Sequence, residues 1–109
     1  MLQKINRLKK KNDFEAVFKK GKSLKTNFLV LKTAPNKLEE SRFGLVVSQK
    51  ISKKAVIRNK VRRRMSEAIK IIMKDIKKGR DIVLIALPGI ESKSFLEIKE
   101  ILASVIKKV

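Results

Sequence analysis

Residues 53–69 read Lys53-Lys54-Ala55-Val56-Ile57-Arg58-Asn59-Lys60-Val61-Arg62-Arg63-Arg64-Met65-Ser66-Glu67-Ala68-Ile69, and the following residues continue the pattern to Gly79. Apolar side chains recur at steps of three and four, which places them on one face of a helix: Met65, Ile69, Ile72 and Ile76, with Val61, Ala68 and Met73 beside them. We therefore expect one long amphipathic helix from about Val56 to Lys78, around which the rest of the chain is organised.

The first turns of this predicted helix carry charge on the face that is apolar further along. Arg58 and Arg62 fall in line with the apolar side chains. Burying an unpaired guanidinium is very costly, so this part of the face must leave the core and meet an anionic group. For Lys70, Lys74 and Lys77, an ordinary solvated charge run is a sufficient explanation.

The composition indicates a folded, strongly basic chain. Its 109 residues suit a single domain, 1–109, and its 29 Lys and Arg against 10 Asp and Glu give a formal charge of +19. Such a charge indicates an anionic partner, with nucleic acid ahead of a membrane surface. No apolar run approaches the ~20 residues of a membrane span, and residues 1–12 lack the apolar core of a signal peptide, so we expect a cytoplasmic protein.

The residue inventory provides poorly for catalysis by the protein itself. Cysteine, histidine, tyrosine and tryptophan are absent, which removes thiolate metal sites, disulfides and the commonest general base. Asp13, Asp75 and Asp81 form no cluster in the sequence, whereas two-metal chemistry needs acidic side chains that converge. We expect no catalytic residue and no metal site in this chain.

Before the long helix, the sequence predicts a basic arm, a helix and a small sheet. Residues 1–11 form the arm, and a helix is expected over Asp13–Lys20, with Asn12 and Glu15 as a capping box and Gly21 as a left-handed stop. Strands are expected at 22–24, 27–35 and 42–48, the last two as an antiparallel hairpin around a polar loop at 36–41.

After the long helix, the sequence predicts a buried strand and a final helix. The apolar run Asp81–Leu87 indicates a strand covered on both faces in the middle of the sheet. Ser94 and Glu97 form a capping box for a helix whose buried face carries Phe95, Ile98, Leu102 and Val105, with Ile101 and Val109 as further candidates. The expected fold is therefore an α+β two-layer sandwich in the order α-β-β-β-α-β-α, with helices packed on about four strands.

Phe14 and Phe18 lie one helical turn apart, and their spacing allows two interpretations. The first is a pair of core side chains, which is the commoner use of such spacing. The second is a pair of partly exposed rings at the edge of a cleft, where the bases of an extended nucleotide strand stack on them. Spacing alone favours the core.

The chain resembles the bacterial ribonuclease P protein subunit over nearly its whole length. The residues that carry the resemblance are Arg7-Leu8-Lys9-Lys10, Asp13-Phe14, Val17-Phe18-Lys19, Gly21, Gly44 to Lys50, Ala55-Val56-Ile57-Arg58-Asn59-Lys60-Val61-Arg62-Arg63, Asp81-Ile82-Val83 and Pro88. Together these segments are a specific match, whereas an isolated Arg-Asn-Lys would mean little.

The resemblance implies a fold and a function. It implies a left-handed crossover through the long helix, against the usual rule. It also implies a ribonucleoprotein endonuclease that removes the 5′ leader of precursor tRNA, in which an RNA subunit is the catalyst with bound Mg²⁺ and the protein helps to bind the leader. The implied partners are the RNA subunit and precursor tRNA, with no membrane and no obligate protein partner.

The same resemblance implies two sets of site residues. The RNA subunit would be contacted by Lys53, Lys54, Arg58, Asn59, Lys60, Arg62 and Arg63. A cleft for the single-stranded leader would be lined by Arg7, Lys9, Phe14, Phe18, Lys32 and Lys50. Guanidinium groups suit phosphates because they bind them bidentately, and aromatic rings suit unpaired bases.

This chain departs from the family pattern at three positions. Lys60 stands where a second arginine is usual, and it keeps the charge but loses the planar fork. Lys32 stands where many relatives have an aromatic residue, and Leu87 stands where an arginine is common. These changes put one stacking position and one basic contact in question.

Three other classes of protein remain as alternatives. A basic structural RNA-binding protein, such as a ribosomal protein or an RNA chaperone, would bind RNA in a salt-dependent manner without promoting leader removal. A nuclease acting without RNA is disfavoured by the residue inventory. A peripheral membrane protein would insert the long helix into lipid, but the apolar face of that helix is needed for the core.

Overall fold

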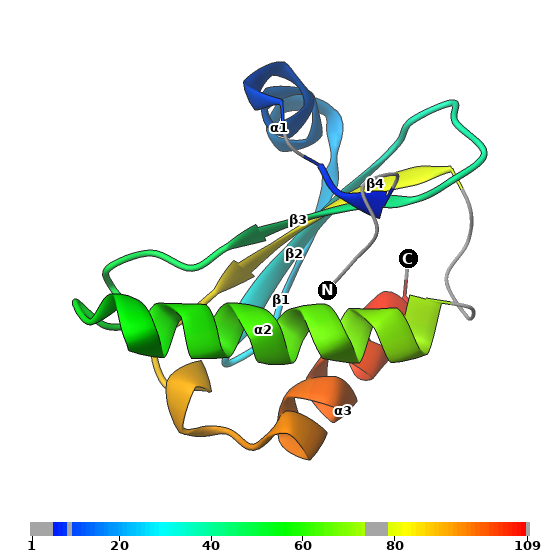
Figure 1. The fold of residues 1–109 in the computed structure, drawn as a ribbon. Coiled ribbons are helices and arrows are strands. Elements are labelled where there is room, and N and C mark those ends of the chain that lie inside the picture. Colours follow the sequence, from blue (N-terminus) through cyan, green and yellow to red (C-terminus); the bar gives the residue numbers. More distant parts are fainter. Residues whose placement is uncertain (1–5, 9, 74–78, 109) are drawn as a thin grey trace.

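The computed structural model describes residues 6–8, 10–73 and 79–108 (Figure 1). Its elements are α1 (Lys11–Lys20), β1 (Lys22–Lys25), β2 (Leu29–Pro35), β3 (Arg42–Val46), α2 (Ala55–Ile72), β4 (Arg80–Ala86), the short 3₁₀ helix η3 (Ile90–Ser92) and α3 (Phe95–Ile106). The predicted class and the order α-β-β-β-α-β-α are confirmed.

The sheet is mixed, and its strand order is β1-β2-β4-β3. β4 pairs antiparallel with β2 and parallel with β3, so it is the central strand that its apolar run predicts. The predicted hairpin between residues 27–35 and 42–48 is wrong, because β4 separates the two strands. An apolar strand that is buried on both faces is more stable inside the sheet, where its backbone groups pair with a neighbour on each side, than at an edge.

One face of the sheet is covered by α2 and α3, which lie together beneath it in Figure 1. The buried residues of α2 are Val61, Met65, Ser66, Ala68, Ile69 and Ile72, in agreement with the predicted stripe. The apolar ones among them pack in one cluster with Leu31, Leu84 and Leu102, none of which exposes measurable surface. The predicted end of the helix near Lys78 lies outside the described residues.

The opposite face carries α1 and a smaller apolar cluster of Leu8, Val17, Ala34 and Val83. The predicted capping box at Asn12 is wrong, since α1 begins after Lys10 and no side chain of the described residues caps it. Its first turn is tied to the sheet instead, because Asp13 meets Arg42.

Gly21 ends α1 for a reason other than the predicted left-handed conformation. Its backbone is extended, with φ −80° and ψ 155°. A Cβ at this position would lie 2.3 Å from the carbonyl oxygen of Val17 and 2.7 Å from that of Thr33. Glycine is therefore required by the close approach of α1 to β2, which spacing along the chain does not reveal.

Two connections complete the fold. The Ser94 and Glu97 capping box at the start of α3 is confirmed. β3 and β4 are parallel neighbours joined through α2, which is the crossover that the resemblance implies, and its handedness stays a prediction. In the N-terminal arm, the N–H of Leu8 donates to the carbonyl of Phe43 at 2.9 Å, which lays residues 6–8 along the outer edge of β3.

Candidate nucleic-acid interface

The loop between β3 and α2 presents three lysines on an anchored turn. Ile51 is buried in the main core and fixes the middle of the loop. The N–H of Lys54 donates to Oγ of Ser52 at 3.1 Å, which orders the residues just before the helix. The side chains of Lys50, Lys53 and Lys54 are exposed. Their ammonium groups therefore project from a backbone with a defined position.

Arg58 is tied to this loop. Its Nη1 donates to the carbonyl of Ser52 at 2.9 Å and to the carbonyl of Lys53 at 3.0 Å, and its side chain is half-buried. Arg58 was expected to turn away from the core to meet an anionic group. Part of its guanidinium is instead satisfied by protein carbonyls, while Nε and Nη2 have no hydrogen bond to any other described residue.

The rest of the predicted α2 surface is open to solvent. Asn59, Lys60, Arg62 and Arg63 are all exposed. Within residues 6–8, 10–73 and 79–108, none of the three cations among them forms an ion pair. Long cationic side chains without carboxylate partners can adapt to the phosphates of a structured RNA.

The start of α2 adds backbone donors to these cations. Its N-cap residue is Lys54, and no side chain in the described part of the chain accepts a hydrogen bond from the first turn. The first turn also contains no acidic residue. The positive end of the helix dipole is thus uncompensated and surrounded by positive charge, which favours an anion at this end.

Arg64 was not predicted to have a role distinct from its neighbours. It is half-buried, and its Nη1 donates to the carbonyl of Lys93 at 2.9 Å, so it ties α2 to the segment before α3. The unbroken run of basic residues in the sequence contains no signal that separates this structural arginine from the exposed ones beside it.

On the opposite face of the sheet, the strand register places side chains in rows that run across all four strands. The row beneath α1, called here the covered row, consists of Ser23, Lys32, Val83 and Gly44. The adjacent row, called the open row, consists of Lys25, Val30, Ile85 and Val46, none of which is buried. Side chains of one row share a face because paired residues point the same way.

α1 lays its side chains along the covered row. The ring of Phe14 packs over Gly44, where an added Cβ would lie 2.4 Å from Cζ of the ring. Phe18 keeps 42% of its surface exposed, and Nζ of Lys32 lies 5.3 Å from the centroid of its ring. The two interpretations of these phenylalanines therefore divide between them: Phe14 is mainly a packing residue, and Phe18 is an accessible ring beside Lys32 of the covered row.

The other residues predicted for the leader cleft do not join this group. Arg7 forms a bridge with Phe43, which puts it on the side of the sheet that faces the main core, and its Nε is buried. Lys50 lies in the loop that leads to α2, near Lys53 in the chain. Lys9 lies outside the described residues. The structure thus brings together Phe14, Phe18 and Lys32 out of the predicted set.

The register also points to a cation that the sequence analysis missed. Lys25 pairs with Val30 and stands at the β1 end of the open row, whereas Lys22 pairs with Thr33 and belongs to the opposite face. Both side chains are exposed. Alternation along β1 separates the two lysines, but only the register of β1 on β2 shows which of them borders the open row.

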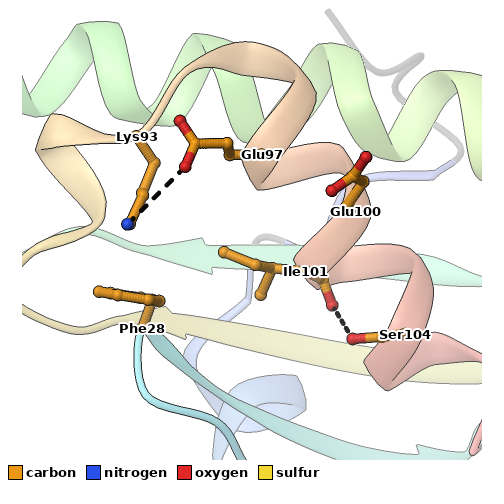
Figure 2. A pocket seen from close by; sticks show the side chains of 6 residues that line it. All are labelled: Phe28, Lys93, Glu97, Glu100, Ile101 and Ser104. Carbon is orange, nitrogen blue, oxygen red and sulfur yellow. Dashed lines mark hydrogen bonds and ion pairs between the residues drawn. The ribbon is translucent and has the colours of Figure 1, made fainter.

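A groove of about 350 Å³ lies beside α3, on the same side of the sheet as the main core (Figure 2). Phe28, Lys93, Glu97, Glu100, Ile101 and Ser104 line it, and none of them was predicted as a site residue. Nζ of Lys93 lies 3.7 Å from Oε2 of Glu97 and 4.5 Å from the centroid of the Phe28 ring. This mixed charge does not favour the binding of phosphate.

The described residues contain no group of three Asp or Glu that could hold a metal ion. Asp13 and Asp81 approach one another, but both bind the guanidinium of Arg42. The hydrogen bond with Asp81 raises the pKa of Arg42 above its ordinary value. No helix among the described residues is long and apolar enough to cross a membrane.

Comparison with known proteins agrees with this geometry. The profile of the Ribonuclease P family matches residues 2–109. The ribonuclease P protein component of Alkaliphilus metalliredigens is 36% identical over 108 residues, which cover 99% of this chain and 96% of the relative. Among solved structures, the RNase P protein from Thermotoga maritima superposes with a TM-score of 0.86 at 34% identity, covering 94% of this chain and 96% of that one.

The RNase P protein of Staphylococcus aureus is equally similar, with a TM-score of 0.85 at 35% identity and 94% of each chain covered. The profile, the identity and the superposition each extend over nearly the whole chain, so they do not depend on the basic motif of α2 alone. The chain belongs to the ribonuclease P protein family.

Proposed function

We propose that this protein is the RNA-binding subunit of a ribonuclease P that removes the 5′ leader from precursor tRNA in the cytoplasm. The observation that carries the proposal is the start of α2, where no described side chain caps the helix end and the exposed cations form no ion pair with a described residue, in a member of this family. The RNA subunit binds there, and the leader binds on the opposite face of the sheet.

The surface proposed for the RNA subunit combines two kinds of donor. Lys53 and Lys54 supply mobile charges, while Arg58 supplies a guanidinium whose position is set by the loop carbonyls. Asn59, Lys60, Arg62 and Arg63 extend the surface along the first turns of α2. A fixed guanidinium loses less conformational entropy on binding a phosphate than a free lysine does, so Arg58 contributes most per contact.

The surface proposed for the leader is the open row together with the exposed ring of Phe18, which lies beside Lys32 of the adjacent covered row. Val30, Ile85 and Val46 offer a half-exposed apolar floor, and Lys25 and Lys32 offer charge near it. Bases of a single strand stack on such surfaces with little sequence preference, and the backbone phosphates meet the lysines. Lys32 lies against the face of Phe18, so at this position the chain presents an ammonium group rather than a second ring.

We assign the bond-breaking chemistry to the RNA subunit and its Mg²⁺. The described carboxylates do not fit a magnesium site in the protein, because no three of them come together, and Asp13 and Asp81 are already engaged with Arg42. The protein's part is to bind and to orient the two RNAs, and no step of the cleavage is drawn through its side chains.

The decisive experiment is reconstitution with a bacterial ribonuclease P RNA at a magnesium concentration where that RNA alone is nearly inactive. Protein and RNA together are expected to yield the mature 5′ end of tRNA, and neither component alone should do so. Tight binding of the RNA without restored cleavage would instead support a structural RNA-binding protein. Cleavage by the protein in the absence of RNA would overturn the assignment of the chemistry.

A matched pair of lysines tests the leader surface. Lys25→Ala is expected to lower the affinity of the assembled enzyme for precursor tRNA about two- to fivefold without changing its affinity for mature tRNA. Lys22→Ala removes the same charge from the same strand on the opposite face, and it should leave both affinities unchanged. Equal effects of the two substitutions would place the leader elsewhere.

A further inference from the structure

The two ends of α1 are held to the sheet in different ways. Towards its C-terminal end, Val17 is 1% exposed and packs in the cluster with Ala34 and Val83. At its N-terminal end no cap is present among the described residues, and Asp13 in the first turn reaches the sheet through Arg42. The first turn is therefore held to the sheet by this polar contact together with the packing of the Phe14 ring over Gly44.

Arg42 is itself fixed by the sheet. Its Nε donates to Oδ1 of Asp81 at 2.9 Å, and its Nη2 donates to Oδ2 at 2.7 Å, which is a bidentate pair between neighbouring strands. Nδ2 of Asn36 donates to Oδ1 of the same carboxylate at 2.9 Å. Because Nε and Nη2 of Arg42 both bind Asp81, the plane of the guanidinium is fixed. The direction in which Nη1 points is therefore fixed as well.

That direction is towards α1. Nη1 lies 3.3 Å from Oδ2 of Asp13, and the residue after Asp13 is Phe14. Two residues after Arg42 on β3 comes Gly44, whose missing side chain leaves the space that the ring of Phe14 fills. Successive residues of α1 thus meet alternate residues of β3 that share one face.

We propose that Arg42 is a positioning residue that, through Asp13, sets the orientation of α1 on the sheet and thereby the place of the Phe14 and Phe18 rings over the covered row. This inference rests on the proposed function and extends it to residues that touch neither RNA. Loss of the contact lets the first turn of α1 lift from β3, which takes the Phe14 ring away from Gly44. Because Val17 keeps the other end of α1 in the core, the helix then tilts about that end and the orientation of the Phe18 ring changes with it.

Asp13→Ala is the appropriate probe. It removes the contact, introduces a good helix former, and leaves Arg42 paired with Asp81. Substitution of Arg42 itself is a poor probe, because it leaves the buried carboxylate of Asp81 without its cation. Loss of the folded state would then dominate the measured effect. Glu15→Ala is the matched control, since Glu15 is an exposed acid of the same helix whose ion pair is an exposed one with Lys11 at 3.9 Å.

The preference of the reconstituted enzyme for precursor over mature tRNA is the functional readout. Asp13→Ala is expected to reduce this preference about two- to fivefold. The effect is modest because the ion pair is partly exposed and influences leader binding only through the orientation of α1. Asp13→Glu restores most of the preference, because it restores a carboxylate. Affinity for the RNA subunit is expected to change no more in Asp13→Ala than in Glu15→Ala.

The NMR signal of the Gly44 α-protons is the structural readout, because the Phe14 ring lies over this residue and shifts its resonance. In Asp13→Ala this ring-current shift should diminish, while the signals of the main core should stay in place. An unchanged Gly44 signal overturns the proposal. So does a changed Gly44 signal with an unchanged preference for precursor tRNA.

The two proposals fail in different ways. A wild-type enzyme with no preference for precursor tRNA contradicts the leader surface itself, and the role of Arg42 in orienting the leader site is overturned with it. A wild-type preference that Asp13→Ala and Glu15→Ala reduce equally leaves the leader surface standing and overturns the role of Arg42.

Discussion

The first turn of a helix has backbone N–H groups without partners in the helix, and α2 and α3 differ in how these groups are treated. At α3, Oγ of Ser94 accepts from the N–H of Glu97 at 3.2 Å, and Oε1 of Glu97 accepts from the N–H of Ser94 at 3.2 Å. At α2 the N-cap is Lys54, no capping side chain is present among the described residues, and lysines and arginines surround the end. Both helices bury an apolar face in the same core.

This difference supports our proposal that the start of α2, and not the start of α3, binds an anionic partner. At the start of α3, the backbone N–H groups of Ser94 and Glu97 are both satisfied by side chains of the helix start itself. The first turn of α2 forgoes that stabilisation, which is typically about 1 kcal/mol for a capping side chain. It keeps its backbone donors and positive dipole available to an anion.

The strongest test of this contrast is Arg58→Ala. We expect its affinity for the RNA subunit to fall about tenfold or more, since a charge-assisted hydrogen bond is worth about 1.5–3 kcal/mol. The slope of log affinity against log salt should become shallower by about 0.7–0.9. Titration of labelled RNA at several salt concentrations measures both quantities.

Lys107→Ala, at the exposed C-terminal end of α3, is the control for Arg58→Ala. It removes one positive charge from a helix end that we do not place against RNA. If it weakens RNA binding as much as Arg58→Ala does, net charge alone explains the affinity and the special role of the α2 start is wrong.

Ser94→Ala tests the opposite helix end. Loss of the N-cap should lower the free energy of unfolding by about 1 kcal/mol, while affinity for the RNA subunit stays as in the wild type. Chemical denaturation and RNA titration on the same preparation measure the two effects. A parallel loss of RNA affinity would show that α3 is also part of the interface.

Lys54→Ser gives α2 the kind of cap that α3 already has. We expect it to raise the free energy of unfolding by about 0.5–1 kcal/mol and to weaken RNA-subunit binding about two- to fivefold. The two changes have opposite signs, so a variant that gains stability and RNA affinity together would refute the idea that the uncapped end serves the partner.

The smallest expected effect is a pH dependence at the start of α3. Hydrogen bonds from Ser94 lower the pKa of Glu97 from its ordinary value of 4.5. A carboxylate with a lowered pKa contributes stability above its unfolded pKa and loses it as the pH falls through the folded one. The stability gap between wild type and Glu97→Gln should therefore be present at pH 7 and close as the pH falls below about 4.

Thermal unfolding at a series of pH values measures this gap. The same series on Lys54→Ser, compared with the wild type, should show no change of the stability difference across this range, because the first turn of α2 contains no acidic residue. A gap for Glu97→Gln that is constant with pH would mean that the charge of Glu97 contributes nothing to the cap.

Much of the fold could be predicted because its signals are local. The stripe of α2, the Ser94 and Glu97 cap and the central position of β4 each follow from residues within a few turns or one strand of one another. The predicted hairpin of β2 and β3 failed because no local pattern records that β4, far along the chain, inserts between them.

For the candidate site, too, the part that depends on local patterns was predicted better than the part that depends on strand pairing. The cationic start of α2 was predicted from the conflict between Arg58 and its apolar neighbours, although the hydrogen bonds of Arg58 to the loop carbonyls were not. The residues of the leader cleft were harder to predict from the sequence. Arg7 lies on the other side of the sheet, and Lys25 was missed, because both assignments depend on the strand register.

Composition, periodicity and short motifs were enough to predict most of the helices and strands, an anionic partner and the family of the chain. That Phe18 is exposed while Phe14 is packed, and that Arg42 joins β4 to α1, could be seen only in the folded chain. The physical reason is that an exposed fraction or an ion pair is a property of neighbours in space. Here those neighbours are brought together by pairings between strands that are distant in the chain.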